Sequence, residues 1–158
     1  MSWPEPLGDQ QVVQLPFSEV ITIARHLDVG ELRSYLNTGS LDDLHDDGTP
    51  PPTAVDDGGR SAQQFVVDVV VRRRSDTRRI SGSGQDIYAV TAPIVVEGVA
   101  RLLDGRHRGP GAMAPGEAFD AVDVLAALER DAGLVVRRDW RTATSSRVTQ
   151  AAGGRRYG

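Results

Sequence analysis

Three side chains that can take part in chemistry lie close together near the middle of the chain, at the predicted start of a helix. Asp86, Tyr88 and Thr91 supply a carboxylate, a phenol and a hydroxyl. The free backbone N–H groups of a helix start favour anions, which makes this a candidate substrate pocket. Capping and packing explain the same residues, with Asp86 or Thr91 satisfying free N–H groups and the Tyr88 ring buried.

Two further candidates for substrate binding lie elsewhere in the sequence. Arg60 follows Gly58 and Gly59 at the end of an acidic stretch, where a guanidinium can bind a substrate carboxylate through two hydrogen bonds. Pairing with the nearby Asp56 or Asp57 is the alternative. His26 is placed near the C-terminal end of a predicted helix, whose dipole favours the protonated imidazole.

Missing residue types exclude several other kinds of site. The chain has no cysteine, and all 18 of its basic residues are arginine. Thiol nucleophiles, thiolate metal sites and Schiff-base chemistry are therefore excluded. The stretch Gly82-Ser83-Gly84 lacks the third glycine of a dinucleotide-binding loop, because Ile87 takes its place. We expect this chain alone to bind no cofactor and no metal, and its catalytic residues stay unassigned.

Composition and charge narrow the classes of partner. The 158 residues carry a formal net charge of −4, so no general basic field favours nucleic acid. No apolar run approaches the roughly 20 residues of a membrane helix, and no secretory signal is recognisable. Together with the absence of cysteine, this predicts a cytoplasmic protein with neither a nucleic-acid nor a membrane partner.

The first part of the chain predicts short elements around a long loop. Residues 1–10 form an N-terminal extension, and 11–16 reads as a strand closed by Pro16. Ser18 is the predicted N-cap of the helix that follows, and alternating residues from 32 to 37 indicate another strand. Residues 38–60 are rich in Asp, Gly and Pro and predict a long acidic loop.

The second part of the chain predicts a hairpin, two helices and a last strand. Residues 63–74 alternate as in a strand with one buried face, and 75–77 suggest a turn. Thr91 is the predicted N-cap of a helix over 92–104, and Asp120 that of a helix over 121–131. A strand over 134–136 ends the predicted domain, 11–137, and 138–158 is a predicted disordered tail. The residues expected to face inward are Phe65, Val67, Val69 and Val71 in the strand over 63–74, and Val95, Val99 and Leu102 in the helix over 92–104.

These elements predict an α+β fold, with two or three helices packed on one face of a mostly antiparallel or mixed sheet. Two segments, Gly84 to Pro93 and Gly111 to Asp120, resemble the second domain of saccharopine dehydrogenase-like NAD(P)-dependent oxidoreductases. The resemblance runs from about Gln11 to Val136. It implies an α+β domain that forms one wall of a substrate cleft and contributes to a homodimer contact.

The resemblance also implies a partner that binds NAD(P). In that family NAD(P) is bound by a first domain, which this sequence lacks, so a separate nucleotide-binding subunit is an implied partner. An isolated second domain cannot position nicotinamide. The leading hypothesis is therefore a substrate-binding and dimerisation domain that is inactive alone, and the alternative is a non-enzymatic dimerising module.

Overall fold

The computed structural model describes residues 1–141. Over this range the chain forms five helices and two small antiparallel sheets, which confirms the predicted α+β class. Residues 142–158, which hold most of the predicted tail, lie outside the described residues.

The first sheet is a pair of short strands near the N-terminus. β1 (Val12–Gln14) pairs antiparallel with β2 (Tyr35–Asn37), and α1 (Ser18–Ala24) lies between them in sequence. Ser18 was predicted as the N-cap of α1, but it is the first helical residue and its hydroxyl donates to the Glu19 side chain. Phe17 holds the cap position without a side-chain hydrogen bond.

The predicted loop over 38–60 contains a helix that the sequence pattern missed. α2 (Thr38–His45) follows directly on β2, and an irregular segment leads from it to the main sheet. Threonine, glycine and serine fill its first turn, and these are weak helix formers. The irregular segment is therefore shorter than the loop predicted over 38–60.

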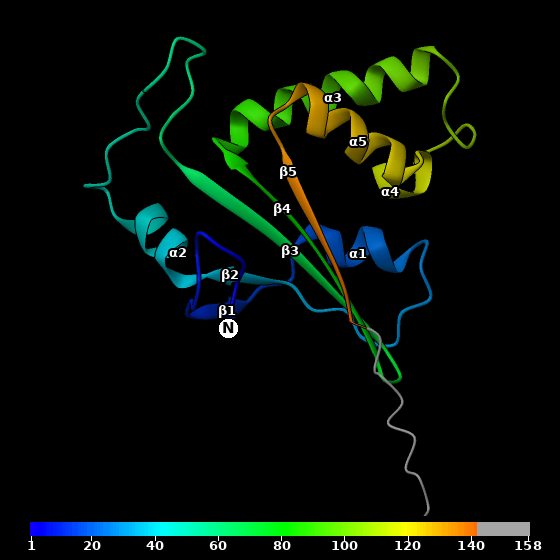
Figure 1. Cartoon of the computed structure of the whole chain (residues 1–158), viewed down its shortest axis with the longest axis horizontal. Coiled ribbons are helices and arrows are strands. Elements are labelled where there is room, and N and C mark those ends of the chain that lie inside the picture. Colours follow the sequence, from blue (N-terminus) through cyan, green and yellow to red (C-terminus); the bar gives the residue numbers. More distant parts are fainter. Residues whose placement is uncertain (142–158) are drawn as a thin grey trace, which may run out of the picture.

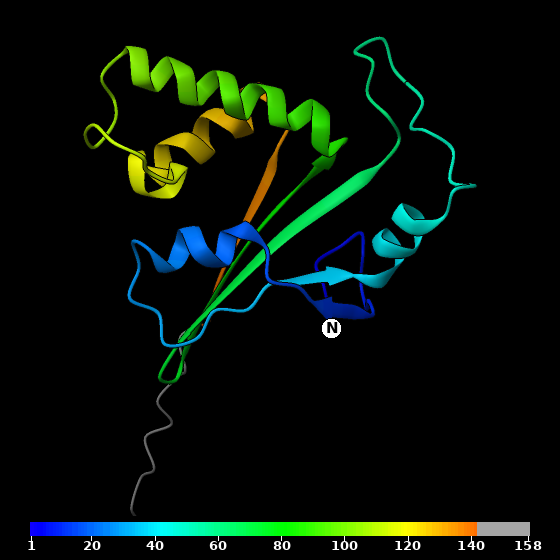
Figure 2. The ribbon, with the colours of Figure 1, turned by 180° about the vertical axis from the view of Figure 1, so that it is seen from behind.

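The main sheet has three antiparallel strands in the order β3-β4-β5, shown in Figure 1. β3 (Gln64–Arg73) and β4 (Asp76–Gln85) form a long hairpin joined by Arg74 and Ser75, with Arg74 at φ 55°. The turn therefore lies one residue earlier than predicted, and Asp76 already pairs with Arg73. The turn end of the hairpin extends beyond the helices in both views (Figures 1 and 2).

β5 (Val135–Arg141) is longer than the predicted strand over 134–136 and crosses the expected domain boundary at 137. Its polar residues Arg137, Arg138 and Asp139 pair with Ser81, Ile80 and Arg79 of β4. A strand is held by its backbone hydrogen bonds, so polar side chains at an edge do not end it. The start of the predicted tail is thus part of the sheet.

Three helices lie between β4 and β5 in sequence. α3 (Ile87–Leu103) and α5 (Ala121–Asp131) pack against each other at one end of the main sheet, and the short α4 (Pro115–Ala118) precedes α5. Asp120 accepts a hydrogen bond from the backbone N–H of Asp123, which confirms it as the cap of α5. Gly133, at φ 65°, follows α5 in the left-handed conformation that ends many helices.

α3 begins five residues earlier than the sequence pattern predicted. Asp86, not Thr91, is its N-cap, because the Asp86 carboxylate accepts from the backbone N–H groups of Tyr88 and Ala89. Thr91 lies inside the helix and its hydroxyl donates to the Ile87 carbonyl. Pro93 suggested a later helix start, yet it also lies inside α3.

The side of α3 that faces α5 carries a buried cation. Arg101 is 1% exposed, and its guanidinium pairs with Glu97 one turn earlier (Nη2–Oε1 2.7 Å) and with Asp123 of α5. These carboxylates raise the pKa of Arg101, with the Asp123 hydrogen bond the main cause, and Arg101 lowers the pKa of Asp123. The joint between the two helices is therefore ionic as well as apolar.

The apolar core is small, and the faces expected to form it are largely exposed. Among the described residues, the buried apolar side chains are Val90, Ala118, Ala127 and Leu128. Val67, Val69 and Val71 of β3 are 55%, 46% and 56% exposed, which contradicts the predicted buried strand face. The physical reason is that α3 and α5 cover only one end of the sheet.

The inward face predicted for α3 is also wrong. Val95, Val99 and Leu102 are 58%, 49% and 53% exposed. α3 instead turns Val90 and Arg101 inward, because the pair of Arg101 with Asp123 fixes the rotation of the helix against α5. The three- and four-residue spacing of these apolar residues correctly predicted a helix. The residues lie on its outer side, however, and not on the buried side.

Truncation of the buried cation tests the ionic joint. We expect Arg101→Ala to lower the free energy of unfolding by about 2 kcal/mol, because it removes both the packed side-chain stem and the charge opposite two carboxylates. Arg101→Met keeps most of the stem, and Glu97 and Asp123 retain access to water, so it should cost about half as much. Urea unfolding followed by circular dichroism measures both. Equal losses would show that packing contributes nothing at this position.

Candidate functional site

The junction between β4 and α3 holds the most tightly bound of the predicted site residues. Asp86 is 8% exposed and adopts φ 57° and ψ 95°, a conformation uncommon for residues other than glycine. Its Oδ1 accepts from the backbone N–H groups of Tyr88 (3.0 Å) and Ala89 (3.1 Å), and its Oδ2 accepts from that of Ser61 (2.8 Å). Both carboxylate oxygens are therefore occupied.

These hydrogen bonds determine the charge state of Asp86. The backbone N–H of Ser61, followed by that of Ala89, holds the pKa of the Asp86 carboxyl below its ordinary value, and burial opposes them only in part. The carboxylate is thus ionised at neutral pH and serves as an acceptor of backbone hydrogen bonds. A general base would need a raised pKa and a free oxygen.

A second set of hydrogen bonds ties the loop before β3 to the same junction. The Gln85 side-chain amide donates to the Ser61 carbonyl (2.8 Å), and the backbone N–H of Asp86 donates to the Gln63 carbonyl (2.7 Å). Ser61 is itself buried, at 7% exposed. The start of β3 and the start of α3 are therefore held together by Gln85 and Asp86.

Arg60 lies next to this junction, but its guanidinium is directed to its own loop. Its Nε donates to Asp56 Oδ2 at 2.8 Å, and Asp56 Oδ1 accepts from the backbone N–H groups of Gly58 and Arg60. The Arg60 backbone N–H is the largest cause of the lowered pKa of Asp56. A substrate carboxylate would have to compete with this ion pair for the guanidinium.

The other predicted residues do not converge on Asp86. Tyr88 is 75% exposed, so the alternative in which its ring is buried is wrong, and Thr91 is exposed on α3. His26 follows α1, where its Nδ1 lies 2.8 Å from the Thr22 carbonyl and its ring lies against Gly116 of α4. α4 is at the far end of α3 from Asp86 (Figure 1). The five residues therefore do not form one pocket.

The sequence reasoning missed the acidic and basic cluster around Arg101. Arg106 Nη1 lies 3.9 Å from Glu97 Oε1 and 3.8 Å from Asp123 Oδ2, which adds a second cation to the joint. The detectable signal was the four-residue spacing of Glu97 and Arg101. With each carboxylate facing two guanidiniums, this cluster joins α3 and α5.

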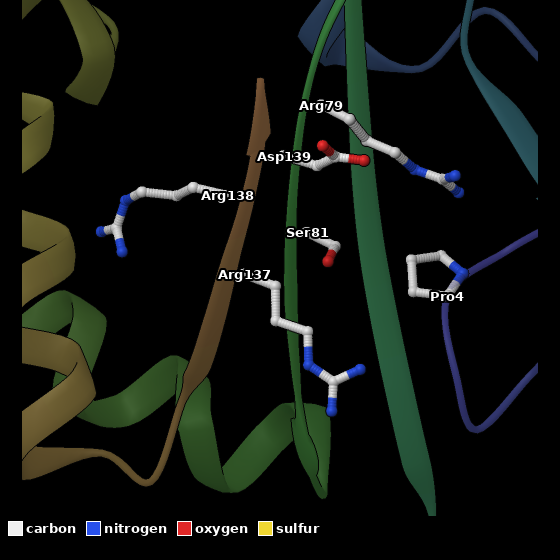
Figure 3. A pocket seen from close by; sticks show the side chains of 6 residues that line it. All are labelled: Pro4, Arg79, Ser81, Arg137, Arg138 and Asp139. Atoms are coloured by element: carbon white, nitrogen blue, oxygen red, sulfur yellow. The ribbon is translucent and has the colours of Figure 1, made fainter. Parts of the chain in front are cut away.

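A shallow hollow lies on the main sheet, beside the N-terminal residues (Figure 3). It measures about 190 Å³ and is lined by Pro4, Arg79, Ser81, Arg137, Arg138 and Asp139. Arg79 is held by Asp68 (Nε–Oδ1 2.8 Å) and by the Ser2 carbonyl (3.0 Å). In Figure 3 Arg138 points away from the others, toward the helices, and it contacts Glu129 of α5 at 3.4 Å. Arg79 and Arg138, two of the charged side chains around the hollow, are thus engaged in structural pairs.

No group of three or more histidine and carboxylate side chains in residues 1–141 is placed to hold a metal ion. Within the same range, no helix combines the length and apolar character needed to cross a membrane.

Comparisons with known proteins give no further information on the family or the function of this chain. No protein-family model matches the chain, and neither the curated proteins nor the solved structures contain a match.

Substitution of Asp86 tests its role at the junction. Asn accepts a hydrogen bond and tolerates positive φ, so Asp86→Asn removes the charge with little strain. We expect the melting temperature at pH 7 to fall by about 3–6 °C, from the usual effect of losing a charged cap.

The pH dependence of that difference follows from the lowered pKa of Asp86. The contribution of the carboxylate is complete above the unfolded pKa of about 3.9 and is lost as the pH falls through the lower folded value. The difference in melting temperature between wild type and Asp86→Asn should therefore shrink as the pH falls below about 4. A difference independent of pH would show that the charge does not stabilise the junction.

Proposed function

We propose that this chain is an association domain, the substrate-binding and dimerisation half of a saccharopine dehydrogenase-like NAD(P)-dependent oxidoreductase. In this proposal NAD(P) is held by a separate nucleotide-binding subunit, and the chain alone binds no cofactor. The sequence resemblance suggests the family. The observation that carries the proposal is an apolar helix face without a described partner.

That face is the outer side of α3, formed by Val95, Val96, Val99, Leu102 and Leu103. These five side chains are between 49% and 82% exposed. They recur at three- and four-residue spacing, as on the buried side of an amphipathic helix. In Figure 2 no other element lies in front of α3. A helix that buries an arginine and exposes its valines and leucines is expected to bury that second side against another protein.

The extent of the face fits a protein contact. From the exposed fractions, the five residues present on the order of 500 Å² of surface, within the range of about 300–600 Å² of the largest apolar patch on a monomer, which is often functional. Each partner in a standard interface contributes about 800 Å². With Ile94 and Tyr88 at its border, 40% and 75% exposed, the outer face of α3 approaches that size.

A second candidate is the non-enzymatic dimerising module. It is favoured by the way the predicted substrate residues are used: Asp86 binds three backbone N–H groups and Arg60 pairs with Asp56. In this alternative the apolar surfaces bind a second copy and no small molecule is bound. Binding of a nucleotide-binding subunit separates the two candidates.

Acidic substitutions on α3 test the apolar face. Because Val99 and Leu103 are exposed, Val99→Glu with Leu103→Glu should lower the free energy of unfolding by less than about 1 kcal/mol. The same variant should lose at least half of the fluorescence gained by the dye 1-anilinonaphthalene-8-sulfonate, which binds exposed apolar surface. Val122→Glu is the matched control, since Val122 is 75% exposed on α5 outside this face. Unfolding of the double variant would mean that α3 packs inward.

The absence of a nucleotide site in this chain is tested by titration. We expect the fluorescence of NADPH to stay unchanged on addition of the purified chain, because no glycine-rich phosphate loop follows a strand within residues 1–141. A saturable change with a micromolar dissociation constant would overturn the claim that a separate subunit supplies the cofactor.

A further inference from the structure

The positive charge of this chain is concentrated in two segments of the sequence. Residues 72–79 hold five arginines and one acidic residue, and residues 137–158 hold six arginines and one acidic residue. The rest of the chain holds the other 20 of the 22 acidic residues and only 7 of the 18 basic ones. The net charge of −4, from which no nucleic-acid partner is expected, therefore does not represent the local charge of these segments.

The two basic segments meet in the main sheet. β5 pairs with β4 as far as Thr77, which lies opposite Arg141, the last described residue. The second segment therefore reaches the turn end of the hairpin, which comprises residues 72–78. This end extends beyond the helices in both overall views (Figures 1 and 2), so a large partner can approach it without meeting α3 or α5.

Three consecutive arginines at the turn end are open to a partner. Arg72, Arg73 and Arg74 are exposed, and their side chains form no ion pair or hydrogen bond with any described residue. Neighbours in a strand project to opposite faces, so Arg72 projects from one face of the sheet and Arg73 from the other, while Arg74 occupies the turn. Asp76 is the one acidic residue among 72–78 and offsets one of these charges.

We propose that the turn end of the hairpin binds the phosphates of a DNA duplex. In this arrangement Arg74 enters the major groove, and Arg72 and Arg73 contact the phosphates of the two strands that border it. A guanidinium suits a phosphate because it donates two parallel hydrogen bonds. Phosphate contacts carry no sequence information, so the binding is independent of base sequence. The inference goes beyond the proposed function and does not depend on the outer face of α3.

The dimensions of the turn end favour this kind of nucleic acid. Beyond Arg141, the described part of the sheet consists only of two strands and their turn. Two to three residues at about 3.4 Å each give a projection of about 7–10 Å. The major groove of DNA is about 12 Å wide and about 8.5 Å deep and admits a two-stranded ribbon. Double-stranded RNA has a narrower major groove that side chains do not enter.

Fluorescence anisotropy of a labelled DNA duplex of about 20 base pairs, titrated with the full chain, tests the proposal. We expect a dissociation constant on the order of 10 μM in about 50 mM salt, and a loss of affinity with salt of about 0.9 logarithmic units per phosphate contact. The triple variant Arg72→Gln, Arg73→Gln, Arg74→Gln should bind at least tenfold more weakly and lower that salt slope by about 2–3. Its melting temperature should be unchanged, because the three side chains are exposed.

The matched control removes three positive charges elsewhere. Arg33, Arg108 and Arg130 are also exposed, and none belongs to either basic segment. The triple variant of these residues to Gln should bind the duplex within about threefold of wild type, since only long-range charge is lost. Equal weakening in both triple variants would show that net charge, and not the turn end, determines binding.

Other results would overturn the proposal directly. Absence of binding by the wild type in about 50 mM salt would remove it, whatever the variants do. Tighter binding to single-stranded DNA or to an RNA duplex of the same length would exclude the major-groove arrangement. Binding to phosphatidylserine vesicles but not to DNA would assign the arginines to a membrane surface. None of these measurements involves α3, so failure of this proposal and failure of the proposed function remain distinguishable.

Discussion

The arrangement of this chain depends on the hydrogen bonds of one buried carboxylate. Asp86 stands where the long hairpin ends and α3 begins, and it accepts backbone N–H groups from both the helix start and the loop before β3. Its positive φ turns the chain sharply at this point. The direction in which α3 leaves the sheet is therefore fixed by polar contacts and not by a large apolar core.

That direction determines which surfaces remain open. Once α3 is fixed at Asp86, its pairing through Arg101 with Asp123 orients the helix and leaves the valines and leucines of its other side exposed. The exposed valines and leucines of α3 suit a complementary apolar face.

The sequence predicted local structure better than it predicted orientation. The hairpin and the helix after Asp120 follow from alternation, turn residues and a capping carboxylate, all of which act over a few positions. Which side of α3 faces inward depends on Asp123, twenty-two residues after Arg101, and no local pattern contains that pairing. For the candidate site, the sequence identified Asp86 as a cap or a substrate contact, and the geometry favours the cap. It could not show that His26 lies near α4, because that contact joins distant parts of the chain.

The connection between β4 and β5 bears on the order in which the chain folds. β3 and β4 meet across a two-residue turn and can pair as soon as both exist, whereas β5 reaches the sheet only after α3, α4 and α5. Distant strands pair late, because a longer loop must be closed first. A half-folded chain therefore shows an unpaired edge on β4 as well as on β3, and aggregation competes with folding during that interval. The last strand to arrive is the one that shields the centre of the sheet.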